Sequence, residues 1–317
     1  MRIAAILVVA LWSVSEAQAE ERWALVLSGA SGGPKYAEQM REWRTGISSA
    51  LVDRYGFSAD KVRMLVDETV KTGEPGTAVN VRKIVGEIRQ GLTRDDVLLI
   101  ILLGHGTYDG DVAKFNLVGP DLTAADWAGL LNGLPGRLVV VNTTSASFPF
   151  LERLAGSNRI VITATDSGAQ KYATVFPEYF VKALGEASSD LDKNGRTSVF
   201  EVFEATSAAV KQHYQQRGQL TTERAVFDDN GDGVGREAEA PGPDGSMARL
   251  LYLDAESPAA ANNPELAALI RRRRELETEA EALKQKKGAM PEPAWQAEYE
   301  KLMIELAKVS REIRTRS

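Results

Sequence analysis

Residues 97–110, VLLIILLGHGTYDG, decide the fold. The first seven are apolar and lie between the charged cluster Arg94-Asp95-Asp96 and a glycine turn, a pattern typical of a strand buried on both faces of a parallel sheet. Gly104 and Gly106 put His105 on a tight turn at the carboxyl end of this strand, where ligands and catalytic groups gather in open α/β sheets. His105 is therefore the first candidate for chemistry. The alternative is a turn histidine whose imidazole is only hydrogen-bonded.

Short apolar runs and helical patterns alternate along the first 254 residues. Further strands are predicted at residues 23–27, 62–66, 137–141 and 159–164. Helices are predicted at residues 36–55, at residues 80–92 with Asn80 as the N-cap, and at residues 124–131 with Thr123 as the N-cap. Strands that alternate with helices require right-handed crossovers, so the predicted fold class is α/β, with a mostly parallel sheet covered by helices on both faces.

The N-terminus predicts export. A basic start at Arg2, an apolar core at residues 3–12 and the small-x-small pattern of Ala17-Gln18-Ala19 are typical of a secretory signal peptide over residues 1–19. This apolar run is too short to span a bilayer, and no later segment is long and apolar enough. We expect an exported protein, periplasmic or secreted, without a membrane span.

Composition excludes several classes of site. The 317 residues contain no cysteine, which rules out a cysteine nucleophile, a thiolate zinc site and an iron–sulfur cluster. The formal net charge of −6 lacks the basic footprint of nucleic-acid binding, so we expect no nucleic-acid partner. The second histidine, His213, falls near the end of a polar helix, where a solvated side chain is expected.

Two strand-end motifs, in their order along the chain, resemble those of the legumain-like and caspase-like cysteine peptidases. In that family one strand ends in His-Gly, and the next ends in a small-residue turn that carries the nucleophilic cysteine. Residues 103–107, LGHGT, match the histidine motif, and residues 139–147, VVVNTTSAS, are similar to the nucleophile strand and its turn. The resemblance covers residues 23–235. It implies a caspase-like fold with His105 and Gly106 in the catalytic turn.

The sequence departs from this family at the nucleophile and at the specificity pocket. Thr143 aligns with the family's cysteine, and Ser145 lies beside it; a hydroxyl needs a well-aligned base before it can attack. The resemblance also implies a charged pocket, but its positions align with the uncharged Ala37 and Val141. Glu178 aligns with a second pocket acid.

Residues 190–201, DLDKNGRTSVFE, fit the twelve-residue calcium loop of EF-hand proteins at each diagnostic position. Gly195 permits the sharp turn that such a loop needs. The predicted oxygen ligands are the side chains of Asp190, Asp192, Asn194, Ser198 and Glu201 and the carbonyl of Arg196. Hard oxygen donors in this number suit calcium rather than a transition metal. The alternative is an acidic turn that only caps the following helix.

Residues 228–239, DDNGDGVGREAE, form a second and less complete match. Asp228, Asn230 and Asp232 have the calcium-loop spacing and Glu239 falls at the twelfth position, but Arg236 stands at the ninth. The Ala-Pro-Gly-Pro sequence that follows cannot continue a long helix. An irregular acidic loop is favoured here over a calcium site.

Composition changes again after residue 254. Residues 255–264 form an Ala/Asn/Pro-rich linker, and residues 265–317 contain two helical segments, 265–287 and 293–314. Apolar residues recur every seven residues in the first segment and alternate by four and three in the second. This narrow apolar seam predicts a coiled-coil-like antiparallel hairpin, which could also join copies of the chain into a homo-oligomer.

These features predict a signal peptide, an α/β domain of legumain/caspase fold over residues 20–254, a linker and a helical hairpin. The favoured hypothesis is a calcium-stabilised pseudo-peptidase that binds a protein or peptide in its strand-end cleft. One alternative is an active hydrolase that uses Thr143 or Ser145 as nucleophile and His105 as base. Another is an exported domain whose calcium loops only add rigidity.

Overall fold

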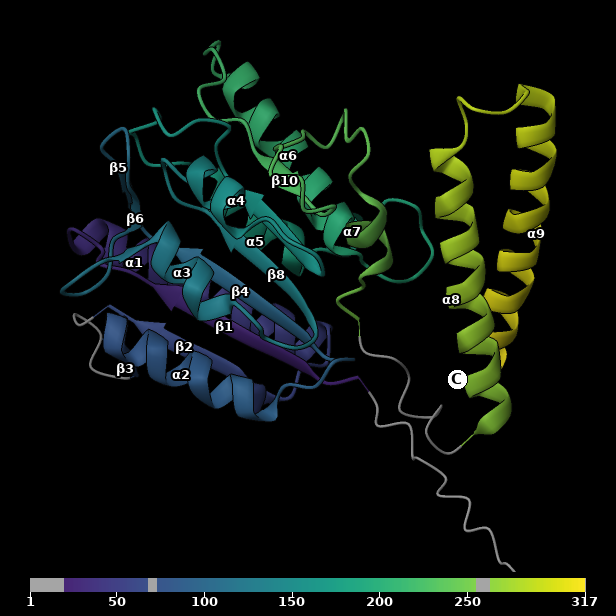
Figure 1. Ribbon diagram of the computed structural model, residues 1–317, viewed down its shortest axis with the longest axis horizontal. Helices are drawn as coiled ribbons and strands as arrows, with labels where there is room; N and C mark the ends of the chain where they lie inside the picture. Colours follow the sequence, from purple (N-terminus) through teal and green to yellow (C-terminus); the bar gives the residue numbers. More distant parts are fainter. Residues whose placement is uncertain (1–19, 68–72, 255–262, 317) are drawn as a thin grey trace, which may run out of the picture.

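The computed structural model describes residues 20–67, 73–254 and 263–316 (Figure 1). The predicted signal peptide and most of the predicted linker lie outside the described residues. A seven-stranded sheet crosses the larger part of the molecule, and helices cover both of its faces. This arrangement confirms the predicted α/β class.

Six of the seven strands run parallel, and one edge strand is antiparallel. In spatial order the strands are β10 (Val226–Asp228), β9 (Arg159–Thr163), β8 (Arg137–Asn142), β4 (Val97–Leu103), β1 (Arg22–Ser28), β2 (Val62–Val66) and β3 (Glu74–Pro75). The antiparallel pair is β10 with β9. Because β4 and β8 are parallel neighbours, the turns that follow them meet at one edge of the sheet.

The central strand β4 is buried along its whole length. Each of its seven side chains is at most 2% exposed, and they alternate between the two cores. Ile101, for example, packs on one face of the sheet and Ile100 on the other. Burial of an aliphatic side chain of this size contributes about 1.5–3 kcal/mol. The continuous apolar run is therefore a strand buried on both faces of the sheet, as its pattern predicts.

Helices pack on both faces of the sheet in the described part of the chain. The helices on one face are α1 (Pro34–Ser49), α5 (Phe176–Gly185) and α6 (Val199–Gln216), and those on the other are α2 (Ala78–Gly91), α3 (Ala124–Leu131) and α4 (Phe148–Leu154). Helix α1 continues into a π-helical turn, Ala50–Arg54, and two short 3₁₀ turns lie at Ala59–Lys61 and Ala187–Ser189.

Two local features differ from the sequence-based expectation. The N-cap of α2 is Thr77 rather than Asn80, because the Thr77 hydroxyl accepts the Asn80 N–H at 3.2 Å. The Asn80 side chain instead donates to the Pro75 carbonyl. Between β4 and α3 the chain also forms a small antiparallel sheet of β5 (Gly106–Tyr108), β6 (Ala113–Phe115) and β7 (Leu122–Thr123).

The C-terminal helices form the predicted hairpin beside the sheet domain (Figure 1). After the short α7 (Ser246–Leu250), helices α8 (Pro264–Gln285) and α9 (Glu292–Arg316) pack against each other. Their antiparallel direction follows from the ion pair between Glu265 and Arg316, at the start of one helix and the end of the other. The hairpin has its own small core of Leu266, Ile270 and Ile313. None of the helices in the described ranges is long and apolar enough to cross a membrane.

Candidate functional site

The turns after β4 and β8 touch each other, as the strand order requires. The Ser145 hydroxyl donates to the Gly106 carbonyl at 3.2 Å. A Cβ atom added at Gly106 would lie 2.4 Å from the Ser145 carbonyl oxygen and 2.5 Å from the Thr144 hydroxyl oxygen. Ala146, in the second turn, has a φ of 52°, a conformation that strains a residue with a side chain. We call this pair of turns the strand-end site.

His105 is half-buried at this site and is held by the loop that follows β1. Its Nε2 atom lies 3.0 Å from the Ser31 carbonyl oxygen, and the Tyr36 ring approaches its imidazole edge-on at 4.9 Å. A carbonyl oxygen can only accept a hydrogen bond, so Nε2 carries a proton in this contact. The Ser31 N–H in turn donates to the Asp67 carboxylate at 3.1 Å.

Two buried residues of opposite charge, Arg44 and Asp67, support this loop. Asp67 and Arg44 are each 6% exposed. Burial lowers the pKa of Arg44, and the negative charge of Asp67 opposes this shift. The Arg44 guanidinium also donates to the Ser28 hydroxyl at the end of β1, at 3.1 Å. The two side chains thus fix the backbone that holds the His105 ring.

The side-chain hydroxyls of residues 143–145 each donate a hydrogen bond to another group of the chain. The hydroxyl of Thr143 donates to the Leu102 carbonyl at 2.7 Å, and that of Thr144 to the Asn142 side chain at 2.8 Å. The two threonines are 1% exposed, and Ser145, which donates to Gly106, is 4% exposed. A nucleophile and its base must lie within hydrogen-bond reach of each other. The hydrogen bonds found among the described residues include none between His105 and these hydroxyls.

Two of the predicted pocket residues lie in different surroundings. Val141 is 1% exposed and belongs to the core on one face of the sheet. Glu178 is exposed in the first turn of α5, where its charge acts on His213. His213 itself is half-buried rather than fully solvated, because its Nδ1 atom lies 2.8 Å from the Tyr179 hydroxyl. Burial and the nearby Arg217 charge lower the pKa of His213.

The first acidic loop, residues 190–201, has the shape of an oxygen-lined cage. Carboxylate oxygens of Asp190, Asp192 and Glu201 lie within 4.8 Å of one another. The Asp190 carboxylate accepts the N–H groups of Asn194 and Gly195, at 3.0 and 2.9 Å, and Gly195 has a φ of 84°. The loop therefore folds around its own acidic side chains.

Glu201 closes this cage at the start of α6. One oxygen of its carboxylate accepts the Leu191 N–H at 3.0 Å, and the other accepts the Ser198 N–H and hydroxyl at 2.7 and 2.8 Å. Burial raises the pKa values of both Asp192 and Glu201. The Glu201 carboxylate is buried and gains from a nearby cation, and oxygen donors alone suit a hard cation such as calcium.

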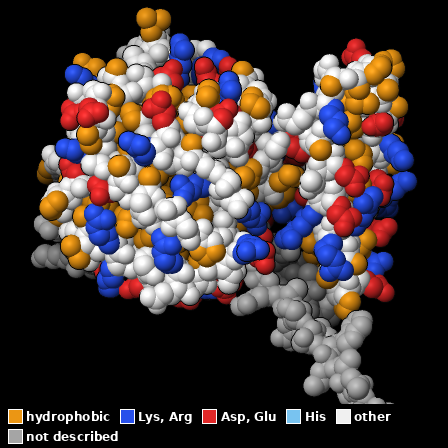
Figure 2. All heavy atoms as spheres, in the orientation of Figure 1, with side chains coloured by type: hydrophobic (Ala, Val, Ile, Leu, Met, Phe, Trp, Pro, Cys, Tyr) orange, Lys and Arg blue, Asp and Glu red, His pale blue; other side chains and the backbone are white. Residues whose placement is uncertain are grey.

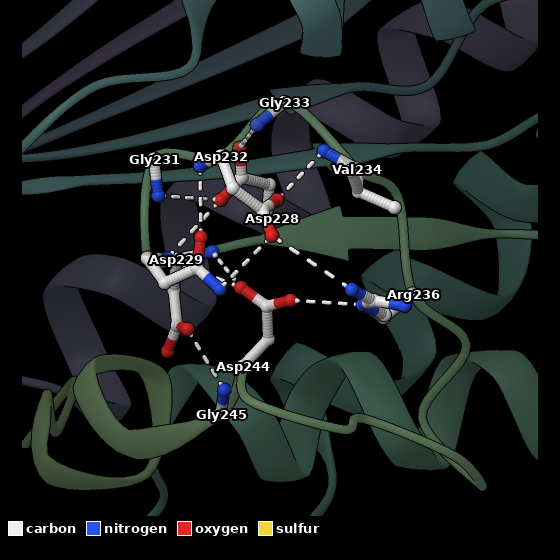
Figure 3. Close-up of polar contacts among 10 residues, drawn as sticks. Asp228, Asp229, Gly231, Asp232, Gly233, Val234, Arg236, Asp244 and Gly245 are labelled. Atoms are coloured by element: carbon white, nitrogen blue, oxygen red, sulfur yellow. Dashed lines mark hydrogen bonds and ion pairs between the residues drawn. The ribbon is translucent and has the colours of Figure 1, made fainter.

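The second acidic loop, residues 228–239, is organised differently (Figure 3). Asp228 accepts the N–H groups of Gly231 and Gly233, at 2.7 and 2.8 Å. The Arg236 guanidinium lies 3.7 Å from the Asp232 carboxylate and 3.4 Å from that of Asp244, as the close-up shows. A cation of the chain itself thus lies against this loop.

Glu239, the predicted twelfth ligand, does not reach the second acidic loop. Its exposed carboxylate pairs with Lys211 on α6 at 2.7 Å. The Asn230 side-chain oxygen, another predicted ligand, accepts the Asp232 N–H at 2.8 Å. The position-twelve assignment stays a prediction that this pairing does not support, and the Pro and Gly residues after Arg236 do not continue a helix.

One buried acid near the strand-end site was not predicted from the sequence. Glu223 is 1% exposed and accepts the Val175 N–H, just before α5, at 2.9 Å. Burial raises its pKa to about 7. The neighbouring Thr174 hydroxyl donates to the Thr143 carbonyl at 2.6 Å. Glu223 thus anchors the segment that supports the turn after β8.

Comparisons with known proteins give limited information. No family model matches the chain. A segment of 57 residues is 35% identical to Metacaspase-4 of Arabidopsis thaliana, and it covers 18% of this chain and 13% of that protein. The crystal structure of protein GSU0716 from Geobacter sulfurreducens aligns with 66% of this chain and 92% of its own, at a TM-score of 0.43 and 13% identity. The sequence similarity points to the caspase-like clan and to no finer group.

Proposed function

We propose that this chain is an exported protein of caspase-like fold that has lost peptidase activity and acts as a calcium-stabilised binding or scaffold module. The observation that carries the proposal is which groups the hydroxyls of the strand-end site are hydrogen-bonded to. Thr143 and Ser145 each donate to a backbone carbonyl, and neither is hydrogen-bonded to His105. The chain also has no cysteine. Without a thiol or an aligned hydroxyl, His105 has no nucleophile to activate.

The test is hydrolysis of a broad peptide-substrate library by the purified chain, with and without calcium. We expect no cleavage above the rate of a His105→Ala variant. Cleavage by the unmodified chain that disappears in the His105→Ala variant would contradict the proposal and favour the hydrolase alternative. A Tyr36→Phe variant is the matched control, because it keeps the ring beside His105 and changes only a hydroxyl.

Calcium binding at the first acidic loop is the second part of the proposal. It is supported by the convergence of Asp190, Asp192 and Glu201 and by the burial that raises the pKa of two of them. The side-chain oxygens of Asn194 and Ser198 and the Arg196 carbonyl complete the expected ligand set. The second acidic loop is not proposed as a calcium site, because Arg236 lies against its carboxylates.

Thermal unfolding with increasing calcium tests this part. A ligand that binds only the folded state at 100 times its dissociation constant stabilises it by about 2.7 kcal/mol. We expect calcium to raise the Tm of the unmodified chain but not that of Glu201→Gln. Glu204→Gln, three residues further along α6, should keep the rise. An unchanged Tm in the unmodified chain would remove the calcium proposal and leave the strand-end proposal standing.

A further inference from the structure

Two arginines form ion pairs with helix α8, one from the first acidic loop and one from α7. Arg196, at the seventh position of the loop, lies 3.5 Å from the Glu277 carboxylate. Arg249, on α7, lies 3.3 Å from the Glu281 carboxylate, one turn further along α8. The two glutamate side chains are 9% and 5% exposed, so both pairs are largely removed from water. Such pairs depend on their geometry, because losing either partner leaves a buried charge.

Aromatic rings of the same region hold both arginines in place. The Arg196 guanidinium lies 3.4 Å from the centre of the Tyr252 ring, and that of Arg249 lies 3.8 Å from the centre of the Phe200 ring. Phe200 precedes the loop's last residue, Glu201. The position of each arginine is thus set by residues in or next to the loop.

The backbone connects the loop to the segment that leads toward α8. Ser198 forms a β-bridge with Tyr252. The Val199 N–H donates to the Leu251 carbonyl, and the Leu253 N–H donates to the Thr197 carbonyl, both at 2.9 Å. A change in the shape of the loop would therefore shift Tyr252 and the Arg196 side chain together.

Charged side chains of both signs gather where the hairpin meets the loop. Figure 2 shows basic and acidic side chains along this boundary. Burial raises the pKa of Glu277, and the charges of Arg196 and Arg273 oppose this shift. A cavity of about 330 Å³ separates the loop from α9 and is lined by Asp192 and Glu201 on one side and Tyr299 and Met303 on the other. Docking of α8 therefore places the Glu277 carboxylate against Arg196 of the acidic loop and the Glu281 carboxylate against Arg249.

We propose that calcium in the first acidic loop and docking of the C-terminal hairpin stabilise each other, so that removal of calcium releases the hairpin from the sheet domain. This inference rests on the proposed calcium site and adds its regulation. A divalent cation fixes the shape of the loop that presents Arg196 to Glu277, and it offsets the charge of the Asp192 and Glu201 carboxylates that line the cavity beside α8. Coupling of this kind is reciprocal, so a hairpin that docks poorly must lower the affinity of the loop for calcium.

The first test measures docking directly in the full chain. Because the sequence has no cysteine, Glu152→Cys on α4 and Gln296→Cys on α9 provide two unique spin-label positions, both exposed. We expect one narrow distance distribution with calcium chloride and a broad, shifted one with a calcium chelator. Magnesium chloride in place of calcium is the control for ionic strength.

The second test is calcium titration by calorimetry of full-chain variants. Glu277→Gln keeps the size of the side chain but removes its charge, and we expect about tenfold weaker calcium binding. Glu275→Gln is the matched control on the same helix, since Glu275 is largely exposed and its ion pair among the described residues is with Arg272 of the hairpin itself. We expect its calcium affinity to stay within about twofold of that of the unmodified chain.

The outcomes separate the two proposals. If the unmodified chain binds calcium but the spin-label distances do not respond to it, or Glu277→Gln binds calcium as tightly as Glu275→Gln, the coupling is overturned and the calcium site stands. If the unmodified chain gives no calcium-binding heat, the calcium site is overturned, and the coupling falls with it.

Discussion

Replacing Gly106 by alanine tests whether the two turns of the strand-end site are in contact. The added methyl group would lie 2.4 Å from the Ser145 carbonyl oxygen and 2.5 Å from the Thr144 hydroxyl oxygen. One of these neighbours is backbone, so a side-chain rotation cannot relieve the overlap. Overpacking of this kind costs about 1–3 kcal/mol, and loss of the Ser145–Gly106 hydrogen bond adds about 0.5–1.5 kcal/mol. The expected loss in the free energy of unfolding is about 2–4 kcal/mol.

Urea unfolding followed by tryptophan fluorescence measures this loss. The matched control is Gly86→Ala in helix α2, where a Cβ atom would meet nothing within 4 Å. That variant should gain up to about 1 kcal/mol, because alanine is the better helix former. If Gly106→Ala unfolds at the same urea concentration as Gly86→Ala, the two turns do not touch, and the description of the strand-end site is wrong.

Two further predictions concern buried charges near the strand-end site. Burial raises the pKa of Glu223 from 4.5 to about 7 in the folded chain. Between these two pH values the folded state keeps a proton that the unfolded state has released. The free energy of unfolding should therefore fall by up to about 3 kcal/mol as pH rises from about 4.5 to about 7. Glu223→Gln should flatten this part of the pH profile of urea unfolding, and an unchanged slope would contradict the assignment. Asp67→Asn should cost about 3 kcal/mol, because it leaves the buried charge of Arg44 without its counter-charge. Asp53→Asn, at an exposed position, is its control, and equal losses in the two variants would show that the buried pair contributes no stability.

The main lines of the fold could be predicted because they depend on local patterns. All seven residues of β4 are apolar, so neither face of the strand favours contact with water. This pattern predicts a central strand. Consecutive strands of a parallel sheet are usually neighbours, and the pairing of β4 with β8 brings the two turns together. The small sheet of β5, β6 and β7 escaped prediction because strands of two or three residues are too short to show periodicity.

The chemistry of the candidate site could be predicted only in part. The sequence identified His105 and the hydroxyl-rich turn, but the partner of the Thr143 hydroxyl depends on where the Leu102 carbonyl points, and no motif encodes that. Glu223 lies in a polar stretch that gives no sign of burial. The ligand spacing of the second acidic loop likewise did not reveal that Arg236 folds back onto it.

The central claim is that the hydroxyls of the strand-end site donate their hydrogen bonds to other groups of the chain, so that His105 cannot activate them. Intact-mass and peptide mass spectrometry after incubation with a hydroxyl-reactive fluorophosphonate probe tests it most directly. The account predicts no adduct on Thr143, Thr144 or Ser145, with or without calcium. An adduct on one of these residues in the native chain that disappears in the His105→Ala variant would contradict it.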